Sequence, residues 1–177
     1  ALMRGVFDGQ PQVFQRVGVP MLGTFPLLSM FLVTSITMLR ERTTGTLERL
    51  MTMPVGRLDV LVGYGIAFGL LALVQVSVAA VVGFGITGLD TQGPVVAVVA
   101  LAVLNALLGM SLGLFVSAFA RTEFQAVQFM PALIMPQFLL SGMLAARERM
   151  VPLLEVASDL MPMAYAYDGL TRVAQGE

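Results

Sequence analysis

The chain has 177 residues, of which 57% are hydrophobic and 12% are charged, and its formal net charge is −1. It contains no Cys, His or Lys. This excludes zinc and haem sites, Ser–His and Cys–His nucleophile pairs, disulfides and a Walker A ATP-binding loop within the chain, while the small net charge argues against a nucleic-acid-binding surface.

Four long uncharged runs dominate the chain, and each exceeds the roughly 20 apolar residues that cross a bilayer as a helix. A soluble protein of this size has no way to bury four such runs. The sequence therefore predicts an all-α polytopic membrane protein with residues 1–177 in a single transmembrane domain. We expect four membrane-spanning helices, at about residues 19–39, 58–87, 95–120 and 124–146.

The chain opens without the basic and apolar regions of a signal peptide. Residues 1–18 are mixed and amphipathic, and we expect them to lie at the membrane interface before the first span. Neither end of the sequence has the character of a native terminus, so we expect further membrane helix on each side.

Residues 40–57 carry four of the ten arginines and follow the first span. A helix over about 41–53 would align Leu47, Leu50 and Met51 in one apolar stripe and end before Pro54. A loop that only sets membrane topology needs arginines but no glutamates. Mixed charges on a short rigid helix suit docking of a protein partner. From physics alone, a docking helix and a plain solvated loop remain equally good interpretations.

After the second span, residues 88–94 are expected to turn, and residues 121–123 form a short polar hinge after the third. Residues 147–170 are predicted to form a re-entrant or amphipathic segment. Its helical stretch Met150–Met161 covers only about 18 Å, which is too short to span. The tyrosines that follow suit the membrane interface.

Short arginine-dense loops stay in the cytoplasm. Four spans place residues 40–57 and 121–123 on one side, with five arginines in 21 residues, and we expect that side to be cytoplasmic. The re-entrant segment is then extracytoplasmic.

Small residues recur at four-residue spacing within the spans, a pattern that permits close helix packing. We expect this packing inside the bundle rather than between chains, at Gly65 and Gly69, Ala102 and Ala106, and Gly109, Gly113 and Ser117. Polar residues in the spans are not ionisable, so no proton relay is predicted. Thr34 and Gln137 are candidates for a substrate path, although hydrogen bonding between helices is the favoured role.

Two motifs carry a resemblance to a known family. Arg40-Glu41-Arg42, Gly45-Thr46-Leu47-Glu48-Arg49-Leu50 and Pro54 resemble the cytoplasmic coupling segment of ABC-2 type transporter permeases. The family commonly has a Gly-Lys pair where this chain has Gly63-Tyr64. Phe138–Gly142, Met150–Pro152 and Leu160–Tyr165 look like the family's extracellular re-entrant segment, with Ala145-Ala146 where a proline is usual.

The similarity covers nearly the whole chain, and it implies a fold and a function. Such permeases have six spans, so this chain would hold the second to the fifth and lack the first and sixth. It would be the membrane subunit of an ATP-driven ABC exporter that moves a hydrophobic or amphipathic substrate, a drug or a lipid-like molecule, outward. The expected location is the plasma membrane as a multi-pass protein, in bacteria the inner or cell membrane.

The resemblance further implies that the chain is not itself an enzyme and holds no cofactor or metal. A separate ABC ATPase subunit would bind ATP and Mg, and a second permease chain, identical or different, would pair with this one among the membrane lipids. No nucleic acid is expected as a partner. The residues implied to dock the ATPase are Glu41, Arg42, Gly45, Thr46, Leu47, Glu48, Arg49 and Leu50.

The alternative of another class is a non-transporting ABC-type membrane scaffold or signalling subunit. Movement of a labelled lipid or drug in liposomes would separate the two. An intramembrane protease is disfavoured, because the chain has no His and because Asp90 and Asp168 lie outside the spans.

Overall fold

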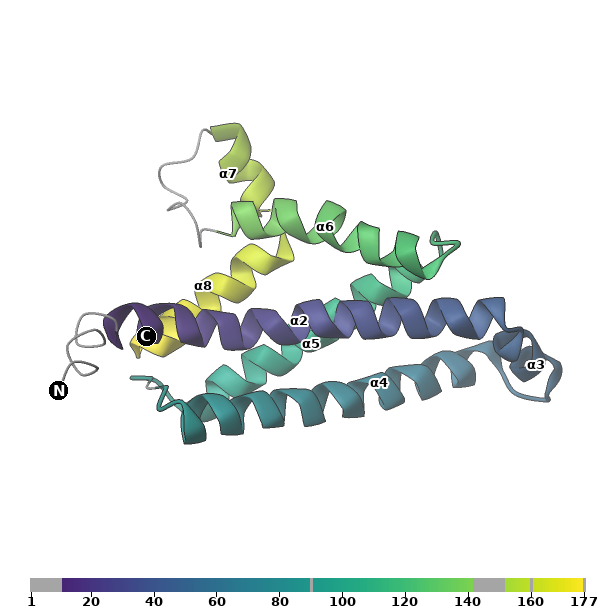
Figure 1. Cartoon of the computed structure of the whole chain (residues 1–177), viewed down its shortest axis with the longest axis horizontal. Coiled ribbons are helices and arrows are strands. Elements are labelled where there is room, and N and C mark those ends of the chain that lie inside the picture. Colours follow the sequence, from purple (N-terminus) through teal and green to yellow (C-terminus); the bar gives the residue numbers. More distant parts are fainter. Residues whose placement is uncertain (1–10, 90, 142–151, 160, 177) are drawn as a thin grey trace, which may run out of the picture.

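The structure, a computed structural model of the whole chain, describes residues 11–89, 91–141, 152–159 and 161–176. Within these ranges the chain is built of helices and turns, without β-strands. In chain order (Figure 1) the helices are α2 (Pro11–Thr43), α3 (Thr46–Thr52), α4 (Arg57–Ala80), its π-helical continuation η1 (Val81–Ile86), α5 (Val95–Ser117), α6 (Glu123–Leu140), α7 (Pro152–Asp159) and α8 (Pro162–Gln175).

Three helices in the described part of the chain are long and apolar enough to cross a membrane: Gly18–Thr43 in α2, Arg57–Ile86 in α4 and η1, and Val95–Ser117 in α5. They coincide with the first three predicted spans. The 18 residues of α6 include Glu123, three glutamines and two prolines, and this helix is not among the three. The fourth predicted span continues into residues 142–146, outside the described residues, and stays a prediction.

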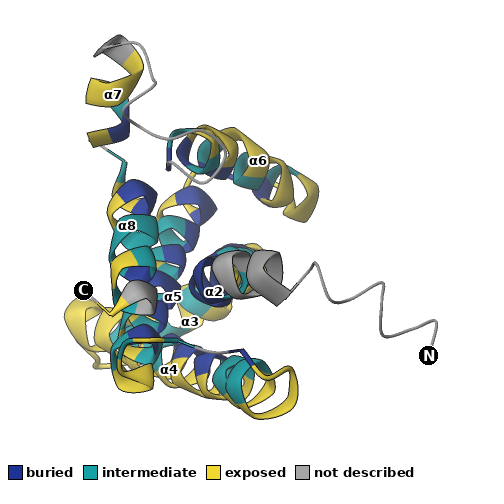
Figure 2. Ribbon diagram, turned by 90° about the vertical axis from the view of Figure 1, so that its left-hand side faces the viewer, coloured by how far each residue is buried: buried dark blue, intermediate teal, exposed yellow. Residues whose placement is uncertain are grey.

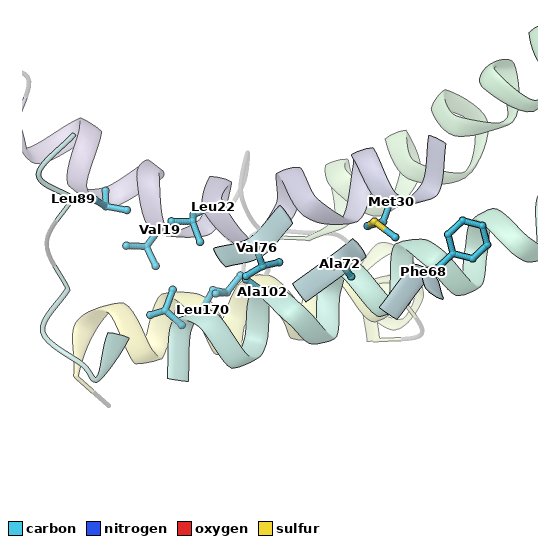
Figure 3. Packing of buried hydrophobic residues seen from close by; sticks show 11 residues of the cluster. Val19, Leu22, Met30, Phe68, Ala72, Val76, Leu89, Ala102 and Leu170 are labelled. Carbon is cyan, nitrogen blue, oxygen red and sulfur yellow. The ribbon is translucent and has the colours of Figure 1, made fainter. Parts of the chain in front are cut away.

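Helix α2 is the axis of the bundle. Its 33 residues extend over about 50 Å, and α4, α5, α6 and α8 are arranged around it (Figures 1 and 2). The main core cluster joins α2 to α4, α5 and α8 (Figure 3). Its fully buried members come from all four helices and include Val19, Met30, Ala72, Val76, Ala102 and Leu170.

The closest helix contact is between α2 and α5, and it rests on two glycines. A Cβ built on Gly113 would lie 2.6 Å from the Phe31 carbonyl oxygen, and one built on Gly109 would lie 2.9 Å from the Leu27 Cα. Real Cβ atoms do not approach backbone so closely, so only glycine fits at these positions. This row of small residues packs inside the bundle, as predicted.

The same prediction is wrong for Gly65 on α4. Among the described residues, nothing lies within 4 Å of a Cβ built there, and a Cβ on Gly69 meets only the end of Leu107, at 3.9 Å. Helix α4 lies at the edge of the bundle and turns most of its apolar surface outward (Figure 2). Gly65 and Gly69 therefore do not bring helices together among the described residues.

In the described part of the segment predicted at 147–170 there are two helices, and α8 packs into the bundle. The re-entrant or amphipathic placement of this segment at a membrane stays a prediction. Leu170 is fully buried against Gly23 of α2, and Met163 is 3% exposed in a cluster with Leu27. Helix α8 starts level with Leu27 and ends beside Gly93, so its 14 residues cover only part of the depth of α2.

The connections between the helices lie at two ends of the bundle. Arg40 and Glu123 meet at one end. At the other end Leu89 lies against Gly18, and the Val173 carbonyl lies against Gly93. Which of these ends faces the cytoplasm stays a prediction.

Candidate functional site

The stretch predicted as one helix at 41–53 is divided in the structure. Helix α2 continues to Thr43 and so includes Glu41 and Arg42, and α3 covers only Thr46–Thr52. The break lies at Gly45, whose φ of 75° is in the left-handed region that glycine adopts without strain. The amide and the hydroxyl of Thr44 both donate to the Arg40 carbonyl, at 2.9 and 2.8 Å, and so close the end of α2.

Helix α3 lies at the end of the bundle and has no buried residue (Figure 1). Glu48 and Arg49 are exposed, while Leu47 and Leu50 are half-buried. Met51 is 44% exposed. The helix therefore presents charges of both signs beside apolar side chains, which is the composition of a surface that binds another protein.

The last turn of α2, just before α3, is held by contacts within the chain. The Arg40 guanidinium donates two hydrogen bonds to the Glu123 carboxylate in the first turn of α6, with Nε–Oε1 at 2.6 Å and Nη2–Oε2 at 2.9 Å. The Arg42 guanidinium donates to the Ser117 carbonyl at the end of α5. Glu41 interacts electrostatically with Tyr64 of α4.

Two of the predicted docking residues, Glu41 and Arg42, do not lie on α3. Glu41 and Arg42 were expected to share one helix with Glu48 and Arg49, but they lie on α2. Glu41 is half-buried, and Arg42 is exposed but donates to the end of α5. Oε2 of Glu41 is buried and, among the described residues, has no hydrogen-bond partner. The sequence did not predict the pairing of Arg40 with Glu123, because no local pattern pairs residues 83 positions apart.

The hinge between α5 and α6 is ordered by its own side chains. The backbone N–H of Gln125 donates to the Thr122 hydroxyl at 3.2 Å. The backbone N–H of Arg121 donates to the side-chain oxygen of Gln125 at 2.9 Å. These bonds satisfy backbone donors at the start of α6.

Hydrogen bonding from Arg40 lowers the pKa of the Glu123 carboxyl below its ordinary value, and the positive charge of the guanidinium adds to this effect.

The two candidate substrate-path residues are buried in helix contacts. Thr34 is fully buried and faces Gly113 of α5, and its hydroxyl has no partner among the described residues. Gln137 is 6% exposed, and its amide nitrogen donates to Leu133 of its own helix at 3.1 Å. A place on a substrate path stays a prediction for both. Hydrogen bonding between helices is found instead at Gln75, which donates to Ser29 of α2.

Within the described ranges, no three His, Cys, Asp or Glu side chains are grouped so that they could hold a metal ion.

Comparison with known proteins gives one family and several relatives. The model of the family "ABC-2 type transporter" matches residues 2–174. ABC transporter G family member 20 of Dictyostelium discoideum is 30% identical over 112 residues, which are 63% of this chain and 15% of that protein. No solved structure matches.

Two bacterial relatives match over more of the chain. Linearmycin resistance permease protein LnrN of Bacillus subtilis is 26% identical over 137 residues, 77% of this chain and 35% of that protein. "Probable multidrug ABC transporter permease YbhR" of Escherichia coli is 25% identical over 141 residues, 80% of this chain and 38% of that protein. The chain thus spans less than two-fifths of the length of the relatives it matches.

Proposed function

The chain belongs to the ABC-2 type transporter family, and on this premise we propose that it forms part of the permease of an ATP-driven exporter. In the proposed assembly a separate ABC ATPase subunit binds ATP and Mg, and a second permease chain completes the membrane pathway. The observation that carries the proposal is α3, an exposed helix with no buried residue that bears the family's coupling motif at one end of the bundle.

The surface proposed to receive the ATPase is α3 with the turn that precedes it. Glu48 and Arg49 are exposed there and are free to pair with charges on a partner. Leu50 is half-buried and Met51 is exposed, so a partner would cover apolar surface as well. Among the described residues, nothing lies within 4 Å of a Cβ built on Gly45, so a partner backbone has room to approach the turn.

The proposed substrate is hydrophobic or amphipathic, and the proposed direction is outward. The support for both is that the bacterial relatives are named for linearmycin resistance and as multidrug permeases. A further support is the absence of charged side chains from residues 17–39 and 60–89, which leaves no obvious site for a hydrophilic ion in the described parts of these helices. The proposed location is a bacterial cell membrane.

The test uses the whole permease that contains this chain, purified with the ATPase that it captures from its native membrane. In proteoliposomes we expect ATP-dependent movement of a fluorescent phospholipid analogue or of an amphipathic dye, with ATP hydrolysis stimulated by the same probe. Capture of the ATPase without movement of either probe would favour the scaffold or signalling alternative. Failure to capture any ATPase would overturn the proposal.

A further inference from the structure

Three successive residues at the end of α2 each reach a different helix. Arg40 binds Glu123 of α6, Glu41 lies beside Tyr64 of α4, and Arg42 binds the last residue of α5. Successive residues of an α-helix point about 100° apart, so three in a row cover most of the helix circumference. Since α2 is the axis of the bundle, such a run meets three of its neighbours, α4, α5 and α6, at once.

The same turn is where α3 joins the bundle. Helix α3 has no buried residue and packs against the end of α2. Only Thr44 and Gly45 separate the two helices, and Thr44 is bonded back to the Arg40 carbonyl. A displacement of α3 therefore reaches the other helices through the last turn of α2.

We propose that Arg40, Glu41 and Arg42, here named the α2 junction, are positioning residues that hold the end of α5, the start of α6 and the first turns of α4 to the end of α2. A push on α3 then moves these helix ends together, and the Arg40–Glu123 pair carries the movement to α6. The link to an ATPase rests on the proposed function, whereas the mechanical tie within the chain does not. The α2 junction would not touch the ATPase.

The Arg40–Glu123 pair is the contact best suited to a test. Its side chains are 64% and 49% exposed, so replacing them leaves no cavity. An exposed ion pair contributes little to folding stability, so its loss is expected to change geometry and coupling more than folding. Arg121 supplies a matched control, because it is an exposed arginine of the same hinge whose side chain makes no ion pair among the described residues.

The variants are Glu123→Arg, the exchange Arg40→Glu with Glu123→Arg, and Arg121→Glu. For spin labelling, cysteines are introduced at Thr52 on α3 and at Gln128 on α6, both of which are exposed. This chain has no Cys of its own that would also react with the label. We expect Glu123→Arg to broaden the distribution of distances between the labels in the isolated permease in nanodiscs. The exchange variant should narrow this distribution again, because it restores an ion pair. The narrowing should be only partial, because an arginine in the first turn of α6 opposes the helix dipole. Arg121→Glu should leave it unchanged.

In the complex with the ATPase, we expect Glu123→Arg to lower transport per ATP hydrolysed by about two- to thirtyfold while the ATPase still co-purifies. An unchanged label distribution in Glu123→Arg, or an exchange variant no better than the single one, would overturn the proposal. Loss of the ATPase from the Glu123→Arg complex would also overturn it, since the pair would then belong to the docking surface. If the unaltered permease captures no ATPase, the proposed function fails, and the labels still test the junction.

Discussion

Gly113 of α5 lies in backbone contact with Phe31 of α2, since a Cβ built on the glycine would stand 2.6 Å from the Phe31 carbonyl oxygen. One turn earlier on α5, Gly109 is in similar contact with Leu27. Without side chains at these two positions, α2 and α5 approach closely enough for their backbones to touch. Because lipid tails compete for apolar side chains, such close packing is a main source of helix association in membranes.

Replacing Gly113 by Ala should therefore separate α2 from α5. We expect the free energy of unfolding to fall by about 1–3 kcal/mol, the usual range for an extra methyl group in a packed interior. The measurement is unfolding in mixed detergent micelles with increasing SDS. Gly65→Ala is the control, because none of the described residues lies within 4 Å of the added methyl group. Equal losses in the two variants would show that glycine content, not the α2–α5 contact, sets the stability.

Gly45 offers a test of the turn between α2 and α3. Its φ of 75° is strained for alanine by about 1–2 kcal/mol, and no atom of the described residues lies within 4 Å of the added Cβ. Gly45→Ala should therefore tilt α3 or fray its first turn, whereas Gly45→Asn should be milder because Asn visits this region more readily. The spin-label distance between Thr52 and Gln128 reports the change. Identical distances in both variants and the unaltered chain would contradict it.

Glu48 tests the docking surface itself. Because Glu48 is exposed on α3 and a partner is expected to pair with it, Glu48→Arg should weaken capture of the ATPase or uncouple ATP hydrolysis from transport, without preventing membrane insertion. Glu155→Arg is the control, since it makes the same charge reversal on the exposed face of α7, away from α3 (Figure 1). Co-purification and stimulated ATP hydrolysis at unaltered levels in Glu48→Arg would remove α3 from the docking surface.

Leu170 tests the attachment of α8, which the sequence analysis did not foresee. Its side chain is fully buried against Gly23. Leu170→Ala should leave a cavity and cost about 2–5 kcal/mol, seen as faster hydrogen exchange of the amides of α8. Val156→Ala on α7 is the control, because Val156 is 60% exposed. Slow exchange in Leu170→Ala would mean that α8 is held by other contacts.

The first three spans could be predicted because the length of an uncharged run is a local property of the sequence. The row from Gly109 to Ser117 was predicted for the same reason, since its spacing lies within one helix. The same prediction failed at Gly65 and Gly69. The spacing of small residues indicates that close packing is possible, but it does not indicate which helix is adjacent.

The sequence predicted which residues make up the candidate site better than it predicted how they are arranged in space. The exposed charges of α3 follow from the sequence, but the left-handed turn at Gly45 places Glu41 and Arg42 on another helix. Their partners Tyr64 and Ser117 are distant in sequence. Helix α8 was not predicted, because Pro162 and the tyrosines are typical of an interfacial stretch. The buried residues Met163 and Leu170 lie seven residues apart on one helix face, and this spacing could have indicated the helix.

The Arg40–Glu123 pair should respond to acid. The pKa of the Glu123 carboxyl is lowered from its ordinary value of 4.5, first by the hydrogen bonds from Arg40. A group whose folded-state pKa is lowered contributes stability above its unfolded-state pKa and loses that contribution as the pH falls through the folded-state value. Because arginine stays protonated over this range, the carboxyl alone decides when the pair breaks.

We therefore expect the spin-label distance between Thr52 and Gln128 to be constant from neutral pH down to roughly pH 5 and to broaden only below about pH 4, given an ordinary glutamate pKa near these values. Glu123→Gln, which lacks a titrating group, should give the broad distribution at every pH. Its ¹³C spectrum, subtracted from that of the unaltered chain, isolates the Glu123 carboxyl resonance. A carboxyl that titrates at or above its ordinary value would show that Arg40 does not hold it in the membrane.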